Sequence, residues 1–211
     1  RPFDWRRANP FGAFKSLGQL PGLGRLFVVF VLYQVAFFVY PAVWAYFGQA
    51  RFGWNAGMIG LSLGLFGIMM AVVQGGLIRV ILARLGERGT VIYGLVFDIF
   101  AFGALAFVTS GTIALILTPL AALGAVITPA LQGIMSKAVG DTRQGELQGA
   151  LTSVGAIAMI IAPMVMTYVF ATFTRDGATV YFPGAPFLMS LCLILVALVV
   201  FVLPQRRAVA G

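Results

Sequence analysis

One carboxylate in this sequence lies inside an apolar stretch. Asp98 is the single charged residue between about Thr90 and Ser110. A carboxylate near the middle of a membrane span costs about 2.5–3.5 kcal/mol on insertion scales, so such residues usually mark functional sites. The functional interpretation is a proton or cation site. The structural one is a carboxyl that hydrogen-bonds a neighbouring helix, and the small side chains of Gly94 and Ala101 would let a helix or a wet cavity approach.

Uncharged polar side chains accompany this acid in other apolar stretches. They are Gln34, Gln74, Gln132 and Ser153. Each could face a substrate path, and each could equally form a hydrogen bond between helices, worth about 0.6 kcal/mol. We predict the three glutamines as candidate substrate contacts.

The other chemistry that we tested is not supported by the residues present. The chain has no histidine and one cysteine, Cys192, so a thiolate or imidazole metal site and a disulfide framework are unavailable. No phosphate-binding loop, dinucleotide fingerprint or Ser/His/Asp set can be assembled. The sequence therefore predicts no enzyme, no cofactor and no metal.

The composition is that of a membrane protein. Hydrophobic residues make up 61% of the 211 and charged residues 9%, with a mean hydropathy of +1.01. A soluble domain is about 45–50% apolar and about 25% charged. The net charge of +8 is better explained by basic cytoplasmic loops than by nucleic acid. We expect membrane lipids as partners and no nucleic acid.

Six apolar stretches predict an all-α membrane protein with six transmembrane helices. A span needs about 20 helical residues. The expected spans are about 26–47, 56–78, 90–110, 112–136, 147–173 and 185–203. They form one bundle over residues 26–203, preceded by a cytoplasmic linker or interfacial segment (1–25) and followed by a cytoplasmic tail (204–211).

Basic residues are distributed unequally between the two sides of this arrangement. With the N-terminus in the cytoplasm, twelve Lys and Arg residues fall on that side, and Arg51 and Arg175 fall on the other. Cytoplasmic loops carry the excess of Lys and Arg. Both termini are therefore expected in the cytoplasm, with the chain in a bacterial inner (plasma) membrane.

Two prolines occupy similar depths in the first and fourth spans. Pro41 and Pro129 would interrupt the equivalent first helices of two three-helix units. Matched interruptions in two halves point to inverted-repeat transporters and their cavity-lining helices. Proline is frequent in membrane helices, so coincidence is the alternative.

Seven short motifs follow one another along nearly the whole chain. They are Asn9–Phe14, Pro41–Trp44, Arg51–Asn55, Ile59–Leu63, Ala83–Arg88, Pro129–Gly133 and Gln144–Gly149. This ordered series resembles the C-terminal six-helix half of major facilitator transporters of the tetracycline-efflux, or drug:proton antiporter, type. The resemblance implies helices seven to twelve of a twelve-helix fold, built as two inverted three-helix repeats. Spans one and four would line a central cavity.

The resemblance also implies roles for individual residues. Asp98 matches the family's membrane-embedded aspartate, which is implicated in proton coupling. Gln74 and Gln132 match polar positions of the second and fourth helices. The loop after the second span resembles the family's Gly-x-x-x-Asp-Arg-x-Gly gating motif, which would assign Arg84, Gly86 and Arg88 to the cytoplasmic gate.

Three positions depart from the family's pattern. Met70 stands where the tetracycline exporters carry a histidine, Phe38 replaces a cavity glutamine, and Ala83 replaces the gating aspartate. These departures argue against tetracycline as the substrate.

Two functional hypotheses follow. The first is the C-terminal half of a proton-coupled exporter of small amphipathic molecules, which needs a second six-helix bundle. That bundle would be a missing N-terminal half, a second chain or a second copy. The second hypothesis is a non-transporting structural or assembly subunit of a larger membrane complex, derived from a transporter half. Asp98 favours the first, whereas Met70 and the presence of six spans rather than twelve favour the second.

Overall fold

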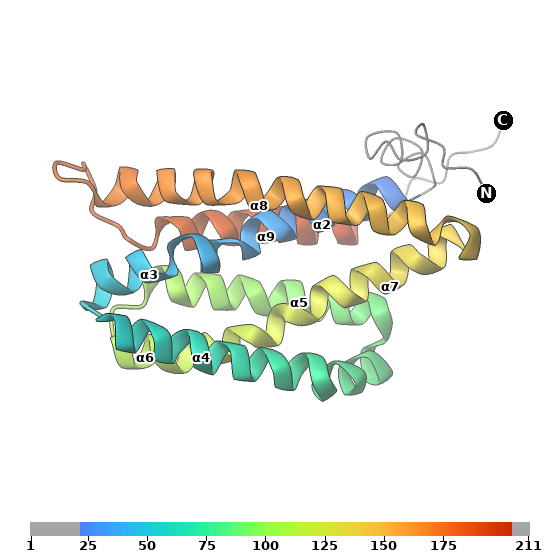
Figure 1. The fold of residues 1–211 in the computed structure, drawn as a ribbon, viewed down its shortest axis with the longest axis horizontal. Helices are drawn as coiled ribbons and strands as arrows, with labels where there is room; N and C mark the ends of the chain where they lie inside the picture. The colour runs from blue at the N-terminus through green and yellow to red at the C-terminus, as the bar shows by residue number, and fades with distance from the viewer. Residues whose placement is uncertain (1–21, 204–211) are drawn as a thin grey trace.

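The computed structural model describes residues 22–203, which fold as helices and their connecting turns. The helices run along the long axis of an elongated bundle (Figure 1). The expected tail (204–211) and all but the last residues of the expected interfacial segment (1–25) lie outside the described residues.

The first rod is interrupted near its middle. Helix α2, Leu23–Phe37, and helix α3, Val39–Phe52, meet at Phe38. Pro41 is the third residue of α3 and has no N–H for the carbonyl of Phe37, so the helical hydrogen bonds cannot continue unbroken. The nearby Ala36 carbonyl accepts a hydrogen bond of 3.0 Å from the Ser190 hydroxyl of α9.

The second rod ends at a sharp reversal. Helix α4, Ala56–Val72, continues through a π-helical turn, η1 (Val73–Leu77), into α5, Ile78–Phe107. Gly86 breaks α5 with φ 66° and ψ 176°, a backbone conformation that favours glycine. The chain runs along α4 and returns along the rest of α5 (Figure 1). Helical structure therefore continues past Ile78, where the apolar stretch ends, until the backbone turns at Gly86.

The remaining rods show one further irregularity. Helix α6, Gly111–Ala121, passes through a 3₁₀ segment, η2 (Ala122–Val126), into α7, Ile127–Val139. Pro129 is the third residue of α7, as Pro41 is of α3. A short 3₁₀ turn, η3 (Asp141–Arg143), leads to α8, Gln144–Thr174, and the chain ends its described part with α9, Ala185–Val202.

Five continuous helical segments of the described chain are long and apolar enough to cross a membrane. They are Leu23–Phe52, Ala56–Phe107, Gly111–Val139, Asp141–Thr174 and Ala185–Val202. The expectation was six. The difference lies in Ala56–Phe107, whose 52 residues would extend about 78 Å if straight, whereas the hydrocarbon core is about 30 Å thick.

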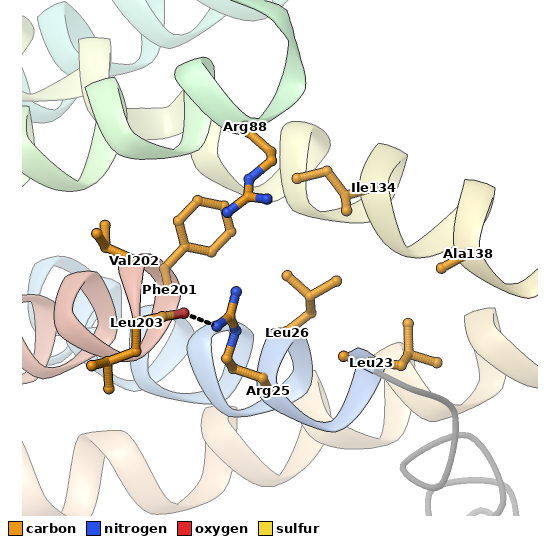
Figure 2. Close-up of a pocket in the computed structure, with 10 residues that line it drawn as sticks. Leu23, Arg25, Leu26, Arg88, Ile134, Ala138, Phe201, Val202 and Leu203 are labelled. Carbon is orange, nitrogen blue, oxygen red and sulfur yellow. Dashed lines mark hydrogen bonds between the residues drawn. The ribbon is translucent and has the colours of Figure 1, made fainter. Parts of the chain in front are cut away.

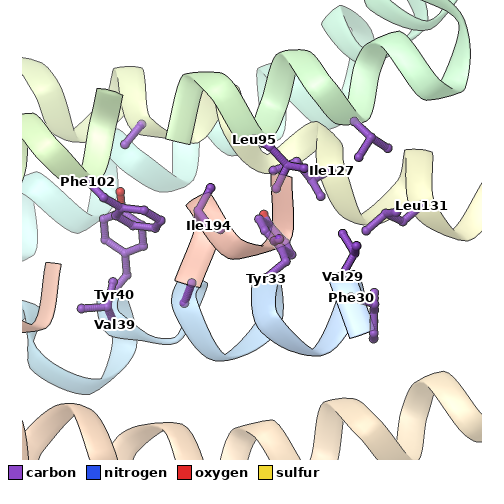
Figure 3. Packing of buried hydrophobic residues seen from close by; sticks show 14 of the residues in the cluster. Val29, Phe30, Tyr33, Val39, Tyr40, Leu95, Phe102, Ile127, Leu131 and Ile194 are labelled. Atoms are coloured by element: carbon purple, nitrogen blue, oxygen red, sulfur yellow. The ribbon is translucent and has the colours of Figure 1, made fainter. Parts of the chain in front are cut away.

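The core lies between α2, α3, α5, α7 and α9. Tyr40, Trp44, Phe47 and Phe187 are buried and form a chain of tilted and edge-on ring contacts, with centroids 4.8–6.1 Å apart. Figure 3 shows Tyr40, a member of this group of rings, beside Phe102 of α5. Helices α4 and α8 lie at the periphery, and their apolar side chains are largely exposed.

One glycine allows α9 to begin directly against α5. A Cβ at Gly184 would collide with the backbone carbonyl of Ala106, which cannot move without shifting helix α5. We therefore expect Gly184→Ala to lower the melting temperature of the purified protein by several degrees. Gly60→Ala is the matched control, because a Cβ there meets nothing within 4 Å. Thermal unfolding in detergent measures the melting temperatures of both variants. An unchanged melting temperature in Gly184→Ala would contradict the close packing of Gly184 against the Ala106 carbonyl.

Candidate functional site

A pocket of about 600 Å³ lies among Leu23–Phe52, the part of Ala56–Phe107 that precedes Gly86, and Gly111–Val139. Its walls come from α2, α4, η1, α5, η2 and α7. The lining residues are Tyr33, Gln34, Phe37, Phe38, Met70, Gln74, Ile78, Ala125, Thr128, Pro129 and Gln132.

Three helix irregularities in these segments contribute to the pocket. Phe38 marks the break between α2 and α3, Gln74 belongs to the π-helical η1, and Ala125 belongs to the 3₁₀ segment η2. Irregular backbone at membrane depth is tolerated where it is buried in protein or lines a cavity. π-helical turns are frequent at functional sites. The backbone is therefore irregular where a ligand would be held.

The pocket brings together the three glutamines singled out from the sequence. Gln34 projects from α2, Gln74 from η1 and Gln132 from α7. The Gln74 amide donates to the Met70 sulfur at 3.2 Å. Their role as substrate contacts stays a prediction. Ser153 does not line the pocket and bonds the Gly149 carbonyl of its own helix at 2.9 Å.

The remaining lining is mostly apolar. Phe38 and Met70, two of the three positions that depart from the family's pattern, both line the pocket, beside Phe37 and Ile78. Tyr33 and Thr128 were missed in the sequence, although each directly precedes a residue that was singled out. The arrangement suits a molecule with an apolar body and a few hydrogen-bonding groups.

Asp98 does not line the pocket but lies behind one of its walls. The residue is 2% exposed, and its carboxylate packs against Gly124 of η2, where a Cβ would collide with it. Gly124 directly precedes Ala125, which lines the pocket. On the same face of α5, Gly94 packs against Ile127 and the Gly124 carbonyl. Contact with a glycine thus places the acid one residue from the pocket surface.

The carboxyl is incompletely bonded in this position. Asp98 Oδ2 is buried and has no hydrogen-bond partner among the described residues, and the same holds for the Tyr40 hydroxyl. A buried polar group without a partner costs about 1–3 kcal/mol, so its retention needs a reason. Tyr33 also lines the pocket.

The three predicted gate residues lie together at the Gly86 reversal and do not line this pocket. Arg84 is exposed, and the Arg88 guanidinium lies 5.8 Å from the centroid of the Phe201 ring. Between them in sequence, Glu87 pairs with Lys137 of α7 at 2.9 Å. This pair ties the reversal to the end of α7.

Within residues 22–203, no group of three or more His, Cys, Asp or Glu side chains is placed to hold a metal ion.

Comparisons with known proteins confirm the resemblance found in the motifs. The chain is 36% identical to the class C tetracycline resistance protein of Escherichia coli over 81% of its length, and 38% identical to the class G protein of Vibrio anguillarum over 78%. It is 30% identical to the class D protein of Salmonella ordonez over 92%. These matches cover 43%, 42% and 50% of the relatives' own lengths, so the chain spans about half of each. No protein-family model and no solved structure matches.

The contact between Asp98 and Gly124 can be tested by a double-mutant cycle. Gly124→Ala should destabilise the protein strongly, because the added methyl displaces the carboxylate. Combining it with Asp98→Ala removes the obstructing group, so the double variant should be more stable than the sum of the two changes predicts. Melting temperatures of the four proteins measure the coupling, and additive effects would show that the two residues do not touch.

Proposed function

We propose that this chain, which is homologous to the tetracycline resistance proteins of the major facilitator type, is the C-terminal six-helix half of a proton-coupled secondary transporter that exports small amphipathic molecules. The observation that carries the proposal is the buried, partly unbonded Asp98 carboxyl directly behind the wall of a pocket that three glutamines line.

The pocket provides the substrate-binding part of the proposed mechanism. Gln34, Gln74 and Gln132 offer amide donors and acceptors on three sides, and the aromatic rings between them offer apolar surface. Phe38 and Met70 make the pocket less polar than the family's pattern implies, so the proposed substrate is a general amphipathic compound rather than tetracycline.

Asp98 provides the proton-coupling part of the proposed mechanism. An ionised carboxyl only accepts hydrogen bonds, whereas a protonated one also donates. Gain of a proton therefore changes what Asp98 can bond in its contact with Gly124 of η2. Because Ala125 follows Gly124 and lines the pocket, a shift of η2 alters the substrate site. Proton binding and substrate binding are linked through this shared wall.

We further propose six spans rather than five, because the reversal at Gly86 divides Ala56–Phe107 into two rods. Prolines at the third positions of α3 and α7 support the assignment of two inverted three-helix repeats. The reversal, with Arg84 and Arg88, would form part of the cytoplasmic gate. Both termini would be cytoplasmic, in a bacterial inner membrane, with residues 26–203 as the bundle between segments 1–25 and 204–211.

A second six-helix bundle would complete the transport path. Transport in this fold rocks one bundle against another around a site near the membrane midplane. The exposed apolar faces of α4 and α8 offer surface for such a partner. The partner would be an N-terminal half of the same polypeptide, a second chain or a second copy of this one.

The alternative is a structural or assembly subunit of a membrane complex. Phe38 and Met70 favour it, because both stand where the family's pattern has polar cavity residues, and neither side chain takes up a proton.

Asp98→Asn tests the coupling role. The amide has nearly the same shape but does not take up a proton, so we expect ethidium-driven proton flux to fall at least about tenfold in proteoliposomes that contain the complete protein. Asp176→Asn is the control, because this acid is exposed in the loop after α8. Unchanged flux in Asp98→Asn, with flux present in the unmodified protein, rejects proton coupling through this residue. No flux in any of the proteins favours the subunit.

Gln132→Leu tests the pocket. Loss of the amide should raise the KM for ethidium by about tenfold with a smaller effect on the maximal rate, as removal of a substrate contact does. Ser153→Ala should leave both parameters unchanged, because this hydroxyl lies outside the pocket. Equal kinetics for the Gln132→Leu variant and the unmodified protein would show that the substrate binds elsewhere.

A further inference from the structure

A second cavity, of about 380 Å³, lies at the end of the bundle where α2 begins and α9 ends (Figure 2). Helices α5 and α7 complete its walls. Two of its lining residues, Arg25 and Arg88, are cationic, and none is acidic. The apolar lining residues are Leu23, Leu26, Ile134, Ala138, Phe201, Val202 and Leu203.

We propose that this cavity binds the phosphate headgroup of an anionic phospholipid, with part of the lipid's apolar body against its aliphatic wall.

The Arg25 guanidinium makes a hydrogen bond and keeps further N–H donors available. It donates to the Leu203 carbonyl at the end of α9, and this bond holds the side chain at the edge of the cavity (Figure 2). This bond also offsets the partial negative charge of the α9 C-terminus. The Nε–H of Arg25 is buried and has no acceptor among the described residues. A guanidinium carries five N–H donors and matches phosphate oxygens in a bidentate arrangement.

Arg88 approaches from the opposite wall. Its guanidinium lies over the face of the Phe201 ring, at 5.8 Å from the centroid. The neighbouring acid, Glu87, is paired with Lys137 instead. Within residues 22–203, no ion pair joins a carboxylate to Arg25 or Arg88. Two cations that face one space, with no carboxylate partner in the described part of the chain, favour an anionic ligand there.

The start of α2 adds a third positive element. The helix begins at Leu23 after Gly22, with no side-chain cap and no acid in its first turn, and both residues line the cavity. The first N–H groups of a helix have no partner within it and bind phosphate oxygens readily.

The apolar wall distinguishes a lipid from a soluble anion. A free phosphate gains nothing from Leu26, Ile134 and Phe201, whereas a phospholipid buries its glycerol and the start of its acyl chains against such side chains. The cavity lies at the end of membrane-length helices, where headgroups are found. Basic pockets between helix ends are known binding sites for anionic lipid headgroups. The proposed lipid site requires that the protein lies in a membrane, but it does not depend on the proposed transport activity.

The test compares three probes on the complete protein, delipidated in a neutral detergent. A ligand that binds the folded state raises the melting temperature. Phosphatidylglycerol should raise it by several degrees, and phosphatidylcholine or inorganic phosphate at the same concentration should raise it much less. Native mass spectrometry should show phosphatidylglycerol retained on the protein.

Arg25→Gln and Arg88→Gln should each weaken apparent phosphatidylglycerol affinity by about tenfold, because each removes charge-assisted hydrogen bonds. Arg79→Gln removes the same charge from an exposed position of α5 outside the cavity and should leave the affinity unchanged. If a glutamine variant does not fold, Arg25→Lys and Arg88→Lys keep the charge but lose bidentate geometry, and an intermediate loss is expected.

Three results would overturn the proposal. Equal effects of phosphatidylglycerol and phosphatidylcholine would show that charge is not recognised. An equal effect of inorganic phosphate would assign the cavity to a soluble anion. Unchanged affinity in both arginine variants, or the same loss in Arg79→Gln, would place the lipid elsewhere.

Discussion

Backbone hydrogen bonding in a medium without water is the constraint on which the rest of this structure depends. A helix that crosses lipid satisfies its own N–H and C=O groups, so each interruption must be sheltered by protein or by a cavity. The break at Phe38, the π-helical turn at Gln74 and the 3₁₀ segment at Ala125 occur in three different rods and border one pocket. Three of the irregular backbone segments are therefore gathered around one pocket.

The buried acid is accommodated by close packing against a glycine of another helix. Asp98 can lie against Gly124 because any side chain at position 124 would occupy the space of the carboxylate. The close approach places a titratable group beside the 3₁₀ segment, which has weaker hydrogen-bond geometry than an α-helix and yields more readily. The acid and the pocket are thus adjacent at this 3₁₀ segment, η2.

Much of this arrangement can be predicted from residue types. A polar side chain in an apolar stretch is visible in the sequence, and the three glutamines found in that way line one pocket. Asp98 was found by the same signal, but its separation from the pocket depends on its direction around the helix and on a glycine in another rod. Hydropathy also ended the second span at Ile78, since it detects the charge of Arg79 but not the backbone turn at Gly86. The cavity at Arg25 and Arg88 depends on residues far apart in sequence, which no local pattern brings together.

Gly86 has a mechanical consequence for the whole domain. A single non-helical residue joins the two rods of Ala56–Phe107, so there is no slack between them. A flexible loop would let one rod tilt while its neighbour stayed still. Here, the rod that holds Asp98 is joined through Gly86 alone, without a loop, to the rod that carries Gln74 and Met70.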